Sequence, residues 1–239
     1  MWPKKSDMEA GGLRPIPMAL ESPEQLWFFI RKVYSIIAIQ VLVTVAVAAT
    51  VNFVGPVTHF LVHTKAGLAL YIVIIFIPFI VLCPLYYYYQ LRPVNYILLG
   101  VFTIALGFVV GLTCAFTSGK VILESATLTA VAVVSLTLYT FWAARRGHDF
   151  SFLGPFLFGA FIAVLLFALI QIFFPLGKIS VMIYGCLASI LFCGYIIYDT
   201  DNLIKRYAYD EYIWAAVSLY MDIINLFLSL LTFCSAQEG

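Results

Sequence analysis

Residues 194–231, GYIIYDTDNLIKRYAYDEYIWAAVSLYMDIINLFLSLL, form two apolar runs around a short polar segment, and each run carries an aspartate. Asp199 lies in the first run and Asp222 in the second, and the midpoint between them falls at Asp210 and Glu211. If the polar segment turns, the two runs become a helical hairpin whose carboxylates lie at a similar depth on neighbouring helices. A charge at membrane depth costs at least about 2.5 kcal/mol on insertion scales, so such residues usually mark an ion or proton pathway.

The composition is that of a polytopic membrane protein. Of the 239 residues, 64% are hydrophobic and only 10% are charged, whereas a soluble domain carries roughly 25% charged residues. The net charge of +1 argues neither for nor against a nucleic-acid partner, because the basic residues form short flanks and no patch. We expect no nucleic-acid partner. The five cysteines show no paired metal spacing, and we expect buried free thiols.

Seven segments reach the length of about 20 apolar residues that a membrane-spanning helix needs. They are residues 33–54, 67–88, 94–116, 121–142, 152–174, 179–198 and 212–233. Because most connections between them are short, successive helices are antiparallel neighbours in one bundle. We therefore expect an all-α polytopic membrane protein with a polar N-terminal tail (1–32), a seven-helix transmembrane domain (33–233) and a short C-terminal tail (234–239).

The distribution of basic residues predicts a cytosolic N-terminus, because cytosolic segments carry an excess of Lys and Arg. The tail and the loops on its side hold Lys4, Lys5, Arg14, Arg31, Lys32, Arg92, Arg145, Arg146, Lys205 and Arg206. The other side holds only Lys65, Lys120 and Lys178. Seven full spans place the C-terminus on the opposite face. If the last segment turned back at Asp222, both termini would be cytosolic.

Small residues indicate where helices approach closely. Gly107 and Gly111 form a GxxxG step in the third segment, which serves either packing inside the bundle or dimerisation. We favour packing inside the bundle, since seven helices already need such contacts.

Polar residues of the last segment form one stripe. Ser218, Asp222, Asn225 and Ser229 are spaced by 4, 3 and 4 residues, which puts them on one helix face. We expect this stripe to line a cavity between other helices. Asp201 is rotated by about 200° from Asp199 on a helix, and we expect it to face the cytosolic mouth.

Two carboxylates within a few ångströms cannot easily both ionise, so the pair of Asp199 and Asp222 is expected to share one proton. This arrangement predicts a pH-dependent lock. The singly protonated pair holds the two helices together, and the doubly ionised pair repels and accepts a divalent cation such as Ca²⁺. The alternative is that each aspartate is a hydrogen-bonded acid that only fixes helix packing.

Glu124 lies four residues after Lys120 at the start of the fourth segment. It forms either an interfacial ion pair or a carboxylate at the outer mouth that attracts cations. His59 and His63 share helical spacing but lack a third ligand, so we expect no zinc site.

Five segments in order resemble the Bax inhibitor-1 (transmembrane Bax inhibitor motif) family, and its lifeguard branch most closely. They are RPVNYILLGV (92–101), VILESATLTA (121–130), HDFSFLGPFLFG (148–159), GYIIYDTDNLIK (194–205) and SLYMDIINLFLSLL (218–231). The resemblance covers roughly residues 28–233.

This resemblance implies seven helices with the last one central and enclosed by the other six. It implies a pH-sensing aspartate pair that Asp199 and Asp222 match, and Glu124 matches an acid of the fourth helix. In bacterial relatives a basic residue at the end of the second helix can latch one aspartate; here Arg92 is displaced by about one turn. Asp201 stands where many relatives carry an amide.

The resemblance also implies a function, namely a pH-sensitive calcium leak that modulates intracellular calcium and suppresses programmed cell death. The alternative is a non-conducting anti-apoptotic adaptor that binds cell-death or calcium-handling membrane proteins. An intramembrane aspartyl protease is disfavoured because no glycine lies near Asp222, so we expect no enzyme. We expect no cofactor and Ca²⁺ as the permeant or bound ion. The oligomeric state stays open, and a monomer is one plausible form. We expect an endoplasmic reticulum or Golgi location, with the plasma membrane as the other option.

Overall fold

The computed structural model of the chain describes residues 23–53, 65–91, 93–174 and 176–238, with residues 65–72 described by their backbone alone. Within these ranges the chain forms seven α-helices, one short 3-10 helix and no strand, which confirms the all-α prediction. The elements are α2 (Pro23–Phe53), α4 (Lys65–Tyr88), α5 (Val94–Cys114), α6 (Gly119–Arg145), α7 (Leu153–Phe173), α8 (Lys178–Lys205), η2 (Tyr209–Glu211) and α9 (Tyr212–Glu238).

Six of these helices are long and apolar enough to cross a membrane, and α4 contributes a further apolar stretch, Val73–Tyr88. Helices α2 and α8 run furthest beyond the predicted spans. Helix α2 begins at Pro23, well before residue 33, and proline suits a first helical position because its missing N–H would be unpaired there. Helix α8 continues to Lys205, because its polar end is stabilised by an ion pair between Asp201 and Lys205, one turn apart.

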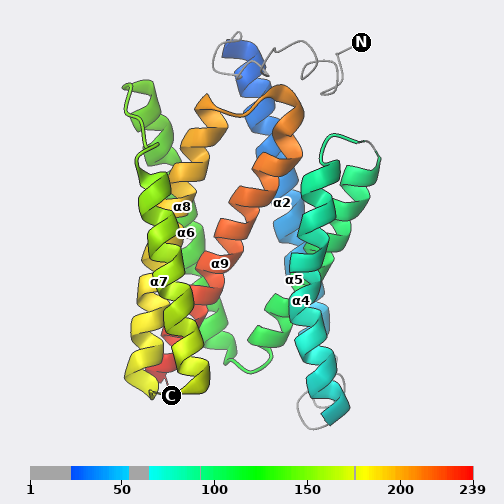
Figure 1. Cartoon of the computed structure of the whole chain (residues 1–239), viewed down its shortest axis with the longest axis vertical. Coiled ribbons are helices and arrows are strands. Elements are labelled where there is room, and N and C mark those ends of the chain that lie inside the picture. Colours follow the sequence, from blue (N-terminus) through cyan, green and yellow to red (C-terminus); the bar gives the residue numbers. More distant parts are fainter. Residues whose placement is uncertain (1–22, 54–64, 92, 175, 239) are drawn as a thin grey trace.

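Helix α9 lies between two groups of three helices, α2, α4 and α5 on one side and α6, α7 and α8 on the other (Figure 1). It packs against α8, α6, α2 and α5, while α4 packs against α5 and α7 against α8. Much of the buried core belongs to α9, including Ile213, Ala216 and Tyr220. The predicted central position of the last helix is confirmed.

Helix α9 is continuous from Tyr212 to Glu238 and does not turn back at Asp222. Its 27 residues extend over about 40 Å, which exceeds the hydrocarbon thickness of about 30 Å. The alternative of a last segment that dips into the membrane and returns is therefore wrong. In Figure 1, α2 begins at one end of the bundle and α9 ends at the other.

The GxxxG step of α5 packs inside the bundle. A Cβ atom on Gly111 would lie 2.9 Å from Cα of Ala48, and one on Gly107 would lie 3.0 Å from Cβ of Val47. Both contacts are with α2, so the two glycines let these helices approach closely. Packing within the chain thus accounts for the step, as the sequence analysis favoured.

Candidate functional site

The hairpin of α8 and α9 brings Asp199 and Asp222 together. Their carboxyl groups lie within hydrogen-bonding reach of each other. Asp222 is only 7% exposed, and its Oδ2 has no hydrogen-bond donor among the described residues. Two ionised carboxylates can only accept hydrogen bonds, so this contact is stable when one carries a proton or when a cation joins them. The predicted meeting of the two side chains is confirmed as geometry.

A tyrosine that the sequence analysis missed lies beside the pair. The hydroxyl of Tyr207 is 3.3 Å from Oγ of Ser218, and Ser218 in turn lies within reach of Asp199. Burial, together with the nearby Asp199 carboxylate, raises the pKa of the Tyr207 hydroxyl, which therefore stays neutral. The only signal in the sequence was an aromatic residue directly after Lys205 and Arg206.

The rest of the polar stripe on α9 is satisfied by its own helix. Asn225 donates to the carbonyl of Met221 over 2.8 Å, and Ser229 donates to the carbonyl of Asn225 over 2.7 Å. Nearby, α8 and α9 meet closely, because a Cβ on Gly185 would lie 2.8 Å from the backbone nitrogen of Phe233. The expected cavity along this stripe stays a prediction.

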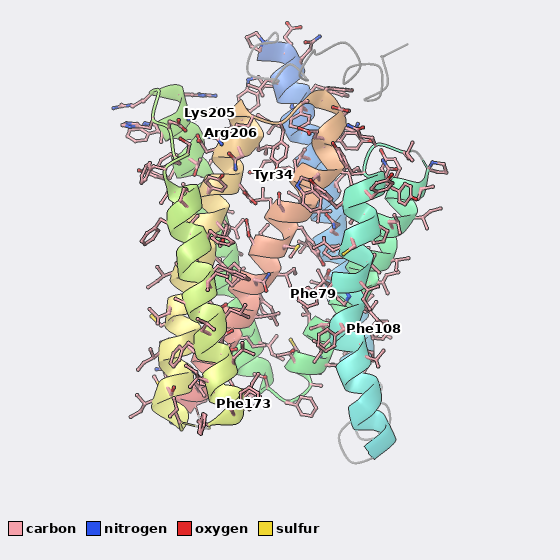
Figure 2. All side chains as sticks on the ribbon, in the orientation of Figure 1. Tyr34, Phe79, Phe108, Phe173, Lys205 and Arg206 are labelled. Carbon is pink, nitrogen blue, oxygen red and sulfur yellow. The ribbon has the colours of Figure 1, made fainter. Side chains whose placement is uncertain are left out.

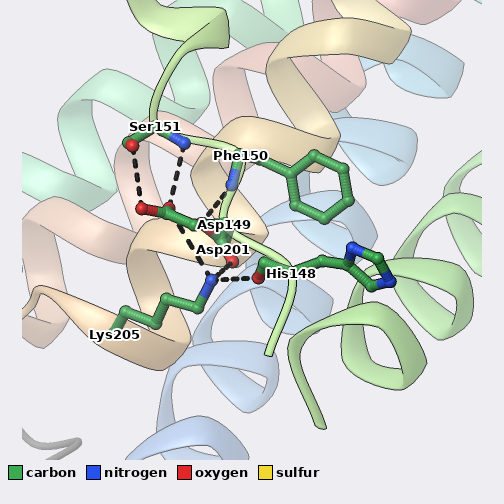
Figure 3. A network of polar contacts seen from close by, with 6 residues as sticks. All are labelled: His148, Asp149, Phe150, Ser151, Asp201 and Lys205. Carbon is green, nitrogen blue, oxygen red and sulfur yellow. Dashed lines mark hydrogen bonds and ion pairs between the residues drawn. The ribbon is translucent and has the colours of Figure 1, made fainter. Parts of the chain in front are cut away.

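Asp201 does not face an open mouth, contrary to the prediction. It is 1% exposed, and its Oδ1 lies 2.6 Å from Nζ of Lys205 (Figure 3). Its Oδ2 accepts a hydrogen bond of 3.2 Å from the backbone N–H of Phe150 in the connection between α6 and α7. The carboxylate is compensated by these donors, so we assign Asp201 to holding that connection against the end of α8.

The same connection makes further contacts with Lys205. The lysine donates to the carbonyl of His148 and lies 3.7 Å from Oδ1 of Asp149. Asp149 accepts hydrogen bonds from the hydroxyl and the backbone N–H of Ser151, over 2.9 and 3.0 Å. The hydrogen bond from the Ser151 hydroxyl, and to a smaller extent the one from its backbone N–H, lowers the pKa of the exposed Asp149 carboxyl. We call this group of residues 148–151, Asp201 and Lys205 the loop clasp.

The remaining predicted residues lie away from the pair. Glu124 is exposed on α6, and Lys120 pairs with Glu238 at 3.5 Å and not with Glu124 as expected for an interfacial pair. Arg92, the suggested latch, lies outside the described residues, as do His59 and His63. At the end of α4, Gln90 donates instead to Asp210 in η2.

Asp199 and Asp222 alone supply too few ligands for a preformed metal site. Among the described residues no group of three or more His, Cys, Asp or Glu side chains could hold a metal ion. Calcium takes six to eight oxygen ligands, so two carboxylates and the Ser218 hydroxyl would need water to complete its shell. All five cysteines are free, as predicted, but only Cys114 and Cys234 are buried; Cys83 and Cys186 are exposed and Cys193 is half-buried.

A family model described as Inhibitor of apoptosis-promoting Bax1 matches residues 26–239. The chain belongs to this family. It is 71% identical to Protein LIFEGUARD 2 of Arabidopsis thaliana over 239 residues, which cover 100% of both chains. It is 35% identical to Bax inhibitor 1 of Schizosaccharomyces pombe over 203 residues, 85% of this chain and 74% of that one. It is 33% identical to the Golgi anti-apoptotic protein of Vaccinia virus over 203 residues, 85% of this chain and 83% of that one.

Proposed function

We propose that this protein is a pH-sensitive calcium leak of an internal membrane and that it helps to suppress programmed cell death. The observation that carries the proposal is the contact of Asp199 with the buried Asp222 at the centre of the bundle. A buried pair of acids within a membrane is costly, and such groups usually serve proton or ion movement.

The proposed gate works through one shared proton. With the proton bound, the carboxyl pair joins α8 to α9 and the bundle is closed. When the proton leaves, the two carboxylates repel each other, and Oδ2 of Asp222, which lacks a donor, becomes a ligand for a cation. Carboxylate oxygens are the ligands that Ca²⁺ prefers, so calcium release should rise with pH.

The names of the relatives support the cellular part of the proposal. One is a Bax inhibitor and another is a Golgi anti-apoptotic protein, which favours cell-death control and a secretory-pathway membrane. The basic residues favour a cytosolic N-terminus. Cell-death or calcium-handling membrane proteins remain the proposed partners.

The test is calcium release from vesicles that contain the purified full-length protein, measured with a calcium dye between about pH 6 and pH 8. We expect wild-type release to rise with pH and the Asp199→Asn and Asp222→Asn variants to lose the pH response. Asp210→Asn is the matched control, because Asp210 lies in the same hairpin and outside the pair.

Unchanged release and pH response in both pair variants would rule out the gate. If those variants also protected cells as well as the wild type, the non-conducting adaptor would be the better account. Binding of a transition-state inhibitor of aspartyl proteases, with cleavage of a membrane peptide, would reopen the enzyme alternative.

A further inference from the structure

Two cavities lie along the seam between α2 and α6. The first has a volume of about 540 Å³ and lies between α2, α5, α6 and α9, with Val41, Ala130 and Phe227 among its lining residues. The second has a volume of about 470 Å³ and is lined by residues of α2 and α6, including Trp27, Tyr34 and Arg145. Both helices line both cavities, so the seam is hollow at two levels.

The two cavities follow one stripe on each helix. On α2 the lining residues Trp27, Tyr34, Val41 and Ala48 are each seven residues apart, which keeps them on one face. On α6 the lining extends from Ile122 to Arg145, a length of about 35 Å at about 1.5 Å per residue. The seam therefore runs through the whole hydrocarbon thickness of about 30 Å.

Size and polarity decide what fits the first cavity. Its lining is almost entirely aliphatic, with only Thr44, Thr129 and Asn52 as polar members besides Cys114. A helix about 10 Å wide would fill roughly 1200 Å³ over ten residues, more than twice the volume of about 540 Å³. A lipid acyl chain matches the space and the chemistry, whereas a partner helix does not.

The end of the seam at Arg145 is basic and aromatic. The Arg145 guanidinium lies 5.6 Å from the centre of the Trp27 ring, and that of Arg146 lies 4.3 Å from the centre of the Trp142 ring. Both arginines are exposed, and neither forms an ion pair with a carboxylate of the described residues. Tryptophan favours the membrane interface, and arginine binds phosphate through two parallel hydrogen bonds.

We propose that the α2–α6 seam binds one anionic phospholipid. Its phosphate-bearing headgroup lies at Arg145 and Arg146, and one acyl chain follows the seam into the cavity on α9. The distance from Arg145 to Val134, where that cavity begins on α6, is about 16 Å along the helix, within the reach of an acyl chain. Figure 2 places Tyr34, which lines the cavity at the headgroup level, towards the end of the bundle that carries Lys205 and Arg206.

The lipid would also lie close to the carboxyl pair of Asp199 and Asp222. Ile223 and Ile224 of α9 line the same cavity, and Ile223 directly follows Asp222. An acyl chain there packs against α9 and fills a gap that side chains leave open. The proposed lipid site does not depend on calcium conduction, and measurements of lipid binding alone test it.

The first arm of the test measures lipid retention. Full-length protein is purified in detergent with phosphatidylserine or phosphatidylcholine, and bound lipid is counted by native mass spectrometry. We expect retained phosphatidylserine in the wild type, and about thirtyfold weaker binding in Arg145→Gln/Arg146→Gln, since each basic residue near the surface is worth about a fivefold change. Arg206→Gln removes one charge at the same end of the bundle without lining either cavity, and should bind as the wild type does.

The second arm tests the acyl chain. Ala130→Phe fills the first cavity and should abolish retention, whereas Ala163→Phe, on the exposed face of α7, should not. Helix content by circular dichroism confirms that each variant is folded. Equal retention of both lipids, retention unchanged in the arginine double variant, or full displacement by chain-free glycerophosphoserine would each overturn the proposal.

Discussion

The ammonium nitrogen of Lys205 lies 2.6 Å from Oδ1 of Asp201, two residues beyond Asp199 on α8. Asp201 is 1% exposed, whereas the Lys205 side chain is 26% exposed. The pair therefore holds a buried carboxylate that has the backbone N–H of Phe150 as its other partner. It fixes the end of α8 that carries the first member of the proposed gate.

Lys205→Gln should destabilise the protein more than a surface charge change does. Removing the lysine leaves Asp201 buried without its cation, which costs about 3–5 kcal/mol in a fully buried pair and about 2 kcal/mol here, since Lys205 is partly exposed. Thermal unfolding in detergent measures the change. Arg206→Gln is the control. If it lowered the unfolding temperature as much as Lys205→Gln does, the loop clasp would contribute no specific stabilisation.

Gly111→Ala should destabilise the bundle, because the new Cβ would lie 2.9 Å from the Ala48 backbone on α2. Overpacking of this kind typically costs about 1–3 kcal/mol. Gly159→Ala on α7 provides the matched control, since its Cβ would meet nothing within 4 Å and alanine favours a helix by up to about 1 kcal/mol. Chemical unfolding of both variants tests the difference; equal stabilities would contradict the close approach of α2 and α5.

Tyr207→Phe should change how stability depends on pH at the alkaline end. Burial raises the pKa of the Tyr207 hydroxyl above its ordinary value of about 10, so the folded protein holds this proton more tightly than the unfolded chain. The hydroxyl therefore contributes its full stabilisation below about pH 10 and loses it as the pH rises through the folded-state pKa.

The wild type should be about 1 kcal/mol more stable than Tyr207→Phe at about pH 8, through the bond to Ser218, and this advantage should shrink above about pH 10. Urea unfolding at about pH 8 and again above about pH 10 measures the difference in stability between the two proteins. Tyr139→Phe, at an exposed position on α6, is the control for removing a tyrosine hydroxyl that makes no bond to Ser218. If the stability of the wild type relative to Tyr207→Phe instead increased with pH, Tyr207 would not have the raised pKa that we infer.

The helices and the approach of Asp199 to Asp222 were predicted from local pattern, and the structure contains both. Hydropathy located all seven α-helices of the described residues, and the spacing of Asp199 and Asp222 around a polar midpoint predicted their meeting, because a hairpin aligns residues equidistant from its turn. The meeting of the two aspartates could be predicted without knowing where the other helices lie. The roles of its members stay a prediction.

Features that depend on packing between distant segments could not be predicted. Thr44 and Tyr220 share a hydrogen bond of 2.6 Å although 176 residues separate them. Gly111 and Gly159 look alike in the sequence, and only the arrangement of the helices shows that one faces α2. The pair of Asp201 and Lys205 was visible as a one-turn spacing, but its burial depends on the connection between α6 and α7.

The most direct test of the central claim is the separation of the Asp199 and Asp222 carboxyl groups in wild-type protein structures determined in lipid nanodiscs at about pH 6 and about pH 8. We predict contact at the lower pH, where one proton joins the groups, and separation or a bridging Ca²⁺ at the higher pH. An unchanged, cation-free contact at both pH values, in protein whose calcium release rises between them, would contradict the gate.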